Sequence, residues 1–142
     1  MTIAPLGPEC RAEVIRLLET SKLPTADLSD RIQMLGVWHG DRLVGVVGLE
    51  PFGDVGLLRS LAVDTSERGT GLGSRLVERL EAMARDEGIG SLYLLTTTAE
   101  AFFQRRGYAC VPRQSAPAAI RGTSEFSSIC PASSAFMCKV LA

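Results

Sequence analysis

Apolar residues recur at helical spacing in two long segments of the chain. The first covers residues 8–21, where a proline suits the start of a helix. The second covers residues 71–87 and predicts a strongly amphipathic helix that ends at Gly88, with an apolar stripe of Leu72, Leu76, Leu80 and Met83. A third, short helix is expected over residues 99–106, before Gly107.

Shorter apolar runs, bounded by turn residues, predict strands between these helices. A β-hairpin is expected from residues 32–38 and 43–49, and an apolar strand over residues 55–63. Further strands are expected over residues 91–97, 108–111 and 136–141. This order predicts an α/β (α+β) sandwich on a mixed, mainly antiparallel sheet.

Two polar segments lie outside these elements. Residues 23–30 predict a short helix or a loop, and residues 113–131, rich in Pro, Ser and Gly, predict a long loop. A loop of that length in a compact domain is more often functional than accidental. With 142 residues, the chain is expected to form one domain, residues 1–142.

Composition and charge narrow the classes of function. The 15 basic and 16 acidic side chains give a net charge of -1, which argues against a nucleic-acid partner. No apolar run reaches the roughly 18 residues that span a bilayer, and the N-terminus lacks the features of a signal peptide. We therefore expect a cytoplasmic location and no membrane partner. The four cysteines form no C-x-x-C pair and the single His39 stands at a turn, so neither a metal site nor histidine-based nucleophilic catalysis is expected.

The strongest chemical signal lies in residues 57–73, where a strand, a glycine loop and a helix follow one another directly. Gly69, Gly71 and Gly73 allow a sharp turn and bring backbone N–H groups close to a ligand. At a helix start, orphan donors and the helix dipole favour an anion, and Arg68 adds a positive charge. The pattern predicts a diphosphate-binding loop, with a plain strand-to-helix turn as the alternative. The lysine of a Walker loop is absent, and a mid-chain position after a hairpin argues against a Rossmann loop.

The sequence of this loop resembles the GCN5-related N-acetyltransferase (GNAT) family. Residues 68–73, Arg-Gly-Thr-Gly-Leu-Gly, match the family signature R/Q-x-x-G-x-G/A, and residues 88–108 resemble its fifth strand and fourth helix. The resemblance extends over residues 32–141. Residues 94–103 resemble N-acetylglutamate synthases, and residues 123–126 and 129–131 resemble small acetyltransferases associated with arsenic-resistance operons.

The resemblance implies a GNAT-like sheet of about seven strands that splays between strands 4 and 5, with helices on both faces. It implies acetyl-CoA as co-substrate and no metal. Backbone groups would contact the pantetheine arm at Leu61, Ala62 and Val63. The pyrophosphate would meet the N–H groups of Arg68, Gly69, Thr70, Gly71, Leu72 and Gly73, and Phe103 would also lie at the cofactor.

Two positions depart from the family pattern. Leu57 stands where many relatives carry a glutamate base, and Phe103 where many carry a tyrosine acid, so both usual proton carriers are absent. Glu50, at the end of the third strand, is our first candidate for the base, with an exposed carboxylate before a turn as the alternative.

Arg59 and Thr97 complete the predicted catalytic residues. Arg59 is either a clamp for a substrate carboxylate or a member of an internal ion pair, because a buried guanidinium needs a partner. Thr97 either contacts substrate or cofactor amides, or caps the following helix with Glu100 in a capping box.

The predicted function is acetyl transfer from acetyl-CoA to the primary amine of a small, anionic, amino-acid-like molecule. A role in detoxification or arsenic resistance fits the narrower resemblance, through acetylation of an amino-acid-like arsenical and not through arsenic binding by Cys130 or Cys138. The sequence is compatible with a homodimer and with a monomer. The alternatives are a non-catalytic acyl-CoA-binding regulatory module and an acetyltransferase for protein N-termini or lysines.

Overall fold

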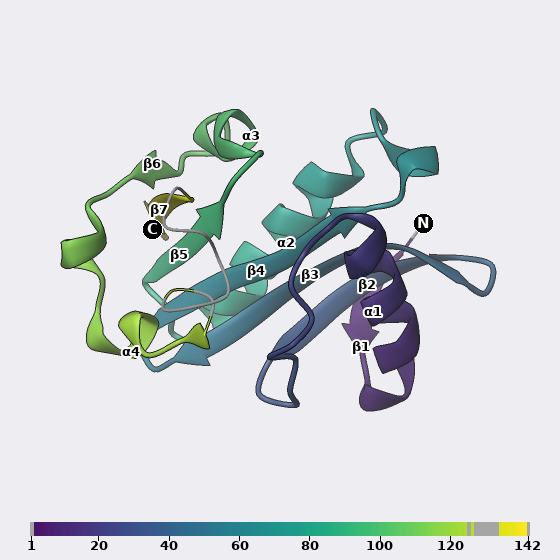
Figure 1. Ribbon diagram of the computed structural model, residues 1–142, viewed down its shortest axis with the longest axis horizontal. Helices are drawn as coiled ribbons and strands as arrows, with labels where there is room; N and C mark the ends of the chain where they lie inside the picture. Colours follow the sequence, from purple (N-terminus) through teal and green to yellow (C-terminus); the bar gives the residue numbers. More distant parts are fainter. Residues whose placement is uncertain (1, 125, 127–133, 142) are drawn as a thin grey trace.

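The computed structural model describes residues 2–124, 126 and 134–141. Within these residues, seven strands form one sheet in the order β1-β2-β3-β4-β5-β7-β6 (Figure 1). The strands are β1 (Ile3–Leu6), β2 (Gln33–His39), β3 (Arg42–Phe52), β4 (Val55–Val63), β5 (Ser91–Thr96), β6 (Ala109–Cys110) and β7 (Ala135–Val140). All neighbours are antiparallel except β4 and β5, which confirms the mixed, mainly antiparallel sheet.

The predicted hairpin is β2–β3, and it is longer than its sequence pattern indicates. β3 continues to Phe52, so the connection to β4 consists of Gly53 and Asp54 alone. β1 was not predicted. It pairs with β2 at the edge of the sheet, and its four residues include Pro5, which lacks the N–H of a ladder donor and weakens the strand signal.

Helices cover both faces of the sheet, as the family resemblance implies. The helices are η1 (Pro8–Cys10), α1 (Arg11–Thr20), η2 (Thr65–Glu67), α2 (Leu72–Asp86), α3 (Glu100–Gln104), η3 (Arg113–Ser115) and α4 (Ala118–Arg121). Among the helices of the described residues, none combines the length and the apolar character needed to cross a membrane.

The contacts of their apolar side chains show which face of the sheet each helix covers. Val14, Leu17 and Leu18 of α1 pack with Val46 and Ala62 of the sheet. On the same face, Ile120 of α4 packs with Leu57 and Phe136. We call this the α1 face. The opposite, α2 face carries Leu76, Leu80 and Phe103 against Leu58, Leu92 and Leu94. Figure 1 shows α1 in front of the sheet and α2 behind it.

The prediction of a loop over residues 113–131 is wrong for the first part of this segment, because η3 and α4 form there. Ile120 is fully buried, and this burial holds the short α4 in place despite its neighbouring Pro, Gly and Ser. Residues 127–131 of that loop, including Cys130, lie outside the described residues, as do parts of the two segments that resemble the arsenic-associated acetyltransferases.

β4 and β5 diverge after three residue pairs. Val55, Gly56 and Leu57 pair with Ser91, Leu92 and Tyr93, whereas β4 continues to Val63 beside β3. A β-bulge sharpens the divergence, because the register between β3 and β4 shifts at Ser60, which has a left-handed φ of 59°. The splay implied by the family resemblance is therefore present.

Candidate active site

The loop that enters α2 has the geometry expected of an anion site. Gly71 is the N-cap of α2, with a φ of 82°, and no side chain caps the helix there. The first N–H groups of a helix have no partner within it, so those of α2 remain available to a ligand. A Cβ placed on Gly69 or Gly71 would meet no heavy atom within 4 Å, so this side of the loop is open.

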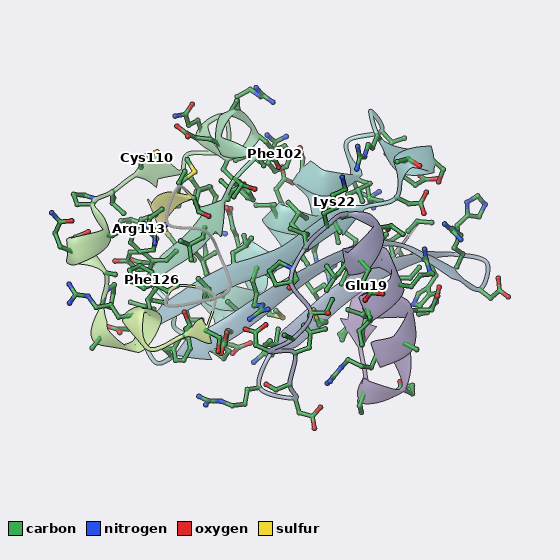
Figure 2. The ribbon with its side chains drawn as sticks, in the orientation of Figure 1. Glu19, Lys22, Phe102, Cys110, Arg113 and Phe126 are labelled. Carbon is green, nitrogen blue, oxygen red and sulfur yellow. The ribbon has the colours of Figure 1, made fainter. Side chains whose placement is uncertain are left out.

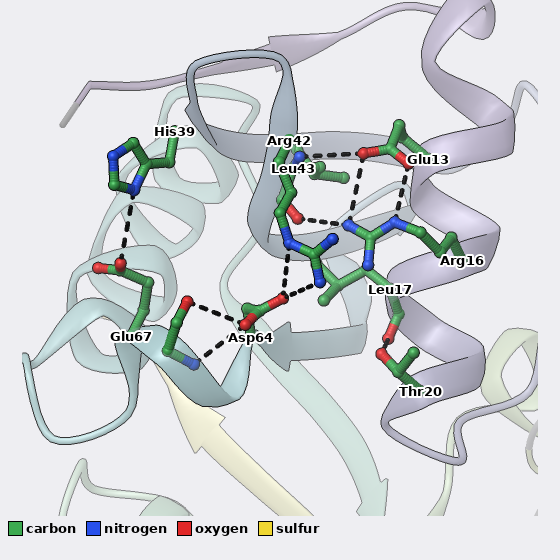
Figure 3. Close-up of polar contacts among 10 residues, drawn as sticks. Glu13, Arg16, Leu17, Thr20, His39, Arg42, Leu43, Asp64 and Glu67 are labelled. Atoms are coloured by element: carbon green, nitrogen blue, oxygen red, sulfur yellow. Dashed lines mark hydrogen bonds and ion pairs between the residues drawn. The ribbon is translucent and has the colours of Figure 1, made fainter.

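Charged contacts hold the approach to this loop in place (Figure 3). Asp64 accepts hydrogen bonds from the N–H and Oγ of Ser66 at 3.0 and 2.9 Å, and Arg42 donates to it at 2.9 Å. These contacts lower the pKa of Asp64 to about 2, the Ser66 N–H bond being the largest cause. His39, the lone histidine, is an exposed residue whose Nδ1 lies 3.9 Å from Glu67.

A cavity of about 720 Å³ occupies the splay between β4 and β5. Its lining comes from both faces of the sheet. Leu58, Leu94 and Phe103 belong to the α2 face. Arg59, Glu19 near the end of α1 and residues 22–26 of the following loop line it from the α1 face. The cavity therefore passes through the sheet. Figure 2 shows Glu19 and Lys22 where α1 ends.

Arg59 forms an internal ion pair, one of the two interpretations that the sequence left open. Its side chain is fully buried, and its Nη1 and Nη2 each lie 2.6 Å from an oxygen of Asp27. Glu50 lies 3.5 Å from Nη1. The bond to Arg59 is the largest cause that lowers the pKa of Asp27. This pair joins β4 to the loop after α1, which forms one wall of the cavity.

The sequence profile described as the acetyltransferase (GNAT) family matches residues 8–108, more than two thirds of the chain. The chain belongs to this family. An amino-acid acetyltransferase of Pseudomonas putida is 37% identical over 79 residues, which cover 54% of this chain and 18% of that protein. One from Ralstonia nicotianae is 38% identical over 72 residues, covering 49% of this chain and 16% of that protein. The chain thus spans less than a fifth of the length of these curated relatives.

Solved structures agree with the GNAT fold. N-acetylglutamate synthase from Neisseria gonorrhoeae, complexed with coenzyme A and L-arginine, superposes with a TM-score of 0.80 at 22% identity, over 99% of this chain and 33% of that chain. Rv2747 from Mycobacterium tuberculosis, in complex with CoA, has a TM-score of 0.82 at 23% identity, over 100% of both chains. These two structures confirm the predicted fold class.

The positions where this GNAT chain lacks the usual proton carriers are apolar in the structure as well. Leu57 is fully buried under α4. Phe103 lines the cavity and packs edge-to-face against Tyr108, with ring centroids 5.4 Å apart. The hydroxyl of Tyr108 offers no substitute, because it is buried and donates to Glu81.

The two remaining catalytic candidates lie in different surroundings. Thr97 is exposed and lines the cavity, whereas Glu50 is not among the described lining residues and faces Arg59 instead. The capping alternative for Thr97 is wrong. The N-cap of α3 is Ala99, and Thr96 is the residue whose hydroxyl accepts from its N–H, at 3.0 Å.

The backbone candidates for the cofactor lie together beside the splay. Leu61 lines the cavity, Ala62 packs toward α1, and Val63 packs toward α2. Arg68, Gly69 and Thr70 are exposed, and the hydroxyl of Thr70 donates to the carbonyl of Glu67. Leu72 is buried, so only its backbone N–H is available.

One cationic side chain beside the α2 loop, that of Arg106, was not predicted from the sequence. Arg106 donates to Ser74 in the first turn of α2, and its guanidinium lies 3.8 Å from the centre of the Phe102 ring. A Cβ on Gly73 would come 3.4 Å from that ring, so the missing side chain lets α3 pack closely on α2. The adjacent arginines Arg105 and Arg106 were the sequence feature that could have indicated a cationic group here. Only the packing of α3 on α2 places Arg106 beside the loop.

The described residues contain no group of three or more His, Cys, Asp or Glu side chains that could hold a metal ion. Burial raises the pKa of the Cys138 thiol, and Ala109 of β6, not another cysteine, pairs with it across the sheet. Low reactivity is expected of such a thiol.

Proposed function

We propose that this chain is an acetyl-CoA-dependent N-acetyltransferase that acts on a small, amino-acid-like amine. The observation that carries the proposal is the cavity in the splay, which is lined by residues from both faces of the sheet. A cofactor can enter on one side and an acceptor on the other. Membership of the GNAT family and the amino-acid acetyltransferases among its relatives support this reading.

The residues present fit the coenzyme. The uncapped N–H groups of α2, from Leu72 onward, suit the diphosphate, and the open space at Gly69 and Gly71 leaves room for it. Arg68 is exposed and forms no ion pair with any described residue, so its charge is available. The pantetheine arm would lie along β4 at residues 61–63, where β5 no longer pairs with that strand.

Acetyl-CoA supplies an activated acetyl thioester. In the transfer, the amine nitrogen bonds to the acetyl carbon and loses a proton, while the C–S bond breaks and the sulfur gains a proton. A backbone N–H of β4 near Leu61 or Val63 would stabilise the developing oxyanion, and positioning within the cavity would supply a large part of the rate. Glu50 remains our candidate base.

An anionic acceptor needs a cation in the cavity. Because Asp27 and Glu50 already face Arg59, Lys22 is the better candidate: it lines the cavity and forms no ion pair with a described residue. An amino-acid-like arsenical is one acceptor of this class, in line with the arsenic-associated resemblance. The cytoplasmic location and the homodimer remain predictions of the sequence.

The decisive experiment measures coenzyme A release from acetyl-CoA over a panel of amines. The panel holds the protein amino acids, their phosphonate, sulfonate and arsenic analogues, and a lysine-containing peptide. Gly71→Asp places a carboxylate at the diphosphate site, so it should abolish both turnover and the rise in Tm that acetyl-CoA produces. Gly88→Asp is the matched control, because Gly88 has a similar φ of 83° at the other end of α2.

We expect turnover of a small amino acid or analogue by the wild type and by Gly88→Asp. Binding of acetyl-CoA without turnover of any amine would instead identify a regulatory acyl-CoA-binding module. Turnover of the peptide alone would indicate a protein acetyltransferase. Stabilisation by NADH or ATP, but not by acetyl-CoA, would contradict the proposal altogether.

A further inference from the structure

Ser134 is a buried polar residue whose hydroxyl makes no hydrogen bond to any described residue. It immediately precedes β7, and only 5% of its surface is exposed. Its Oγ is buried and has no hydrogen-bond partner among the described residues, although Ser134 lines the cavity between β4 and β5. A buried hydroxyl without a partner costs free energy, so its presence needs an explanation.

The position of this serine is well defined. Arg113 donates a hydrogen bond of 2.9 Å to its carbonyl oxygen, and the next residue, Ala135, pairs with Thr96 of β5. The serine therefore lies where β5 ends, beside the threonines that line the same cavity.

The alternation of side chains places Ser134 on the α1 face of the sheet. Phe136, two residues further on, packs with Leu57 on that face, whereas Met137 packs on the α2 face. The glycine loop that suits the coenzyme diphosphate opens α2, on the opposite side. The serine hydroxyl thus belongs to the part of the cavity that remains for the acceptor.

We propose that the Ser134 hydroxyl is an acceptor-binding group, which hydrogen-bonds a polar oxygen of the amino-acid-like molecule that receives the acetyl group. This inference rests on the proposed function and adds a specificity residue to it. The bound acceptor supplies the partner that the hydroxyl does not find among the described residues. A carboxylate or a related oxyanion is the best match, because a hydroxyl donates to it without a competing donor.

The test compares Ser134→Ala with Ser115→Ala, a matched change at an exposed serine whose hydroxyl donates to the carbonyl of Pro112. Coenzyme A release is measured with the amino acids and phosphonate, sulfonate and arsenic analogues of the panel above. For every amine turned over, Ser134→Ala should raise the acceptor KM by roughly three- to tenfold, the loss expected for one hydrogen bond. The Kd for acetyl-CoA should change less than about twofold, since the diphosphate site is untouched.

Stability provides the second measurement. Because the hydroxyl has no partner among the described residues, Ser134→Ala should leave Tm unchanged or raise it, whereas a structural hydroxyl would lower it. Ser134→Cys keeps the volume and a weak donor, and it replaces the alanine variant should that one fail to fold.

The outcomes separate the two proposals. Wild-type turnover with an unchanged acceptor KM in Ser134→Ala and Ser134→Cys overturns this inference and leaves the proposed function intact. A changed Kd for acetyl-CoA with an unchanged acceptor KM also overturns it, since the hydroxyl would then bind the coenzyme. Absence of wild-type turnover on the whole panel overturns the proposed function, and this inference with it.

Discussion

Arg59 shows how one residue in an apolar strand organises its surroundings. Its guanidinium is fully buried and holds both oxygens of Asp27, which lies 32 positions earlier in the chain. Removing one partner of a buried ion pair leaves the other charge uncompensated, which is costly, whereas exposed pairs contribute little. The stability of the loop after α1 therefore depends on this arginine.

We predict that Arg59→Ala lowers the free energy of unfolding by about 3 kcal/mol, because Asp27, whose side chain is 16% exposed, loses its bidentate and fully buried partner. Arg59→Lys should lower it less, since lysine keeps the charge but loses the bidentate geometry. Urea unfolding followed by circular dichroism measures both. Arg42→Ala is the control, because Arg42 is 57% exposed in its pair with Asp64, and should cost below about 1 kcal/mol.

The same variants decide between the two roles of Arg59. Under the substrate-clamp hypothesis, Arg59→Ala would keep nearly full stability, while Arg59→Lys would raise the acceptor KM. That combination would contradict the structural role of the ion pair.

Among the elements, α2 is the helix that the glycine loop opens, and a buried polar cluster fixes it to the sheet. Glu81 of α2 is 5% exposed. It accepts a hydrogen bond of 2.9 Å from the hydroxyl of Tyr108 and bonds of 3.0 and 3.1 Å from Nζ of Lys139 in β7. Burial is the main cause that raises the pKa of Tyr108, followed by the Glu81 charge. The tyrosine hydroxyl therefore serves as a donor to the helix.

We predict that Glu81→Ala destabilises the protein by about 3 kcal/mol, because a tyrosine hydroxyl and a lysine ammonium both lose their acceptor. Tyr108→Phe should cost only about 1 kcal/mol, since Lys139 continues to compensate the carboxylate. Thermal unfolding of the two variants measures the difference. Equal and small effects would show that α2 is held by its apolar face alone.

Across the whole molecule, three of the described carboxylates are stabilised in their charged form by their surroundings. Hydrogen bonds and ion pairs lower the pKa of Glu13 in α1, of Asp27 in the following loop and of Asp64 after β4, with Arg16, Arg59 and Ser66 as the respective main causes. A carboxylate whose pKa is lower in the folded than in the unfolded state stabilises the fold above its unfolded pKa and loses that effect as the pH falls.

The pKa of Asp64 falls from 3.8 to about 2 on folding, so its contribution is complete above about pH 4 and is lost as the pH falls toward 2. Asp64→Asn should therefore lower stability at pH 6 and lose less stability than the wild type between pH 6 and pH 2.5. The measurement is the urea midpoint at both pH values. Ser66→Ala removes one of the hydrogen bonds to Asp64. The stability that this variant loses between pH 6 and pH 2.5 should therefore lie between the losses of the wild type and of Asp64→Asn. An unchanged pH dependence in Asp64→Asn would exclude this group as a source of acid sensitivity.

The sequence by itself determined the parts of this protein that depend on neighbours in the chain. The apolar stripe of α2, the β2–β3 hairpin and the glycine loop over residues 68–73 were all readable, because helix periodicity, turn residues and helix-start donors are local properties. The family signature lies in the same local segment, which is why the family and the fold class could be predicted from it.

Only the tertiary structure decided which side chains meet. It paired Arg59 with Asp27, brought Arg106 to the start of α2, and left the Ser134 hydroxyl without a partner among the residues that the structure describes. Each of these depends on contacts between segments far apart in the chain, on which local patterns carry no information. The edge strand β1 and the short helix α4 escaped prediction for the same reason, because pairing with β2 and burial of Ile120 stabilise what their own sequences do not.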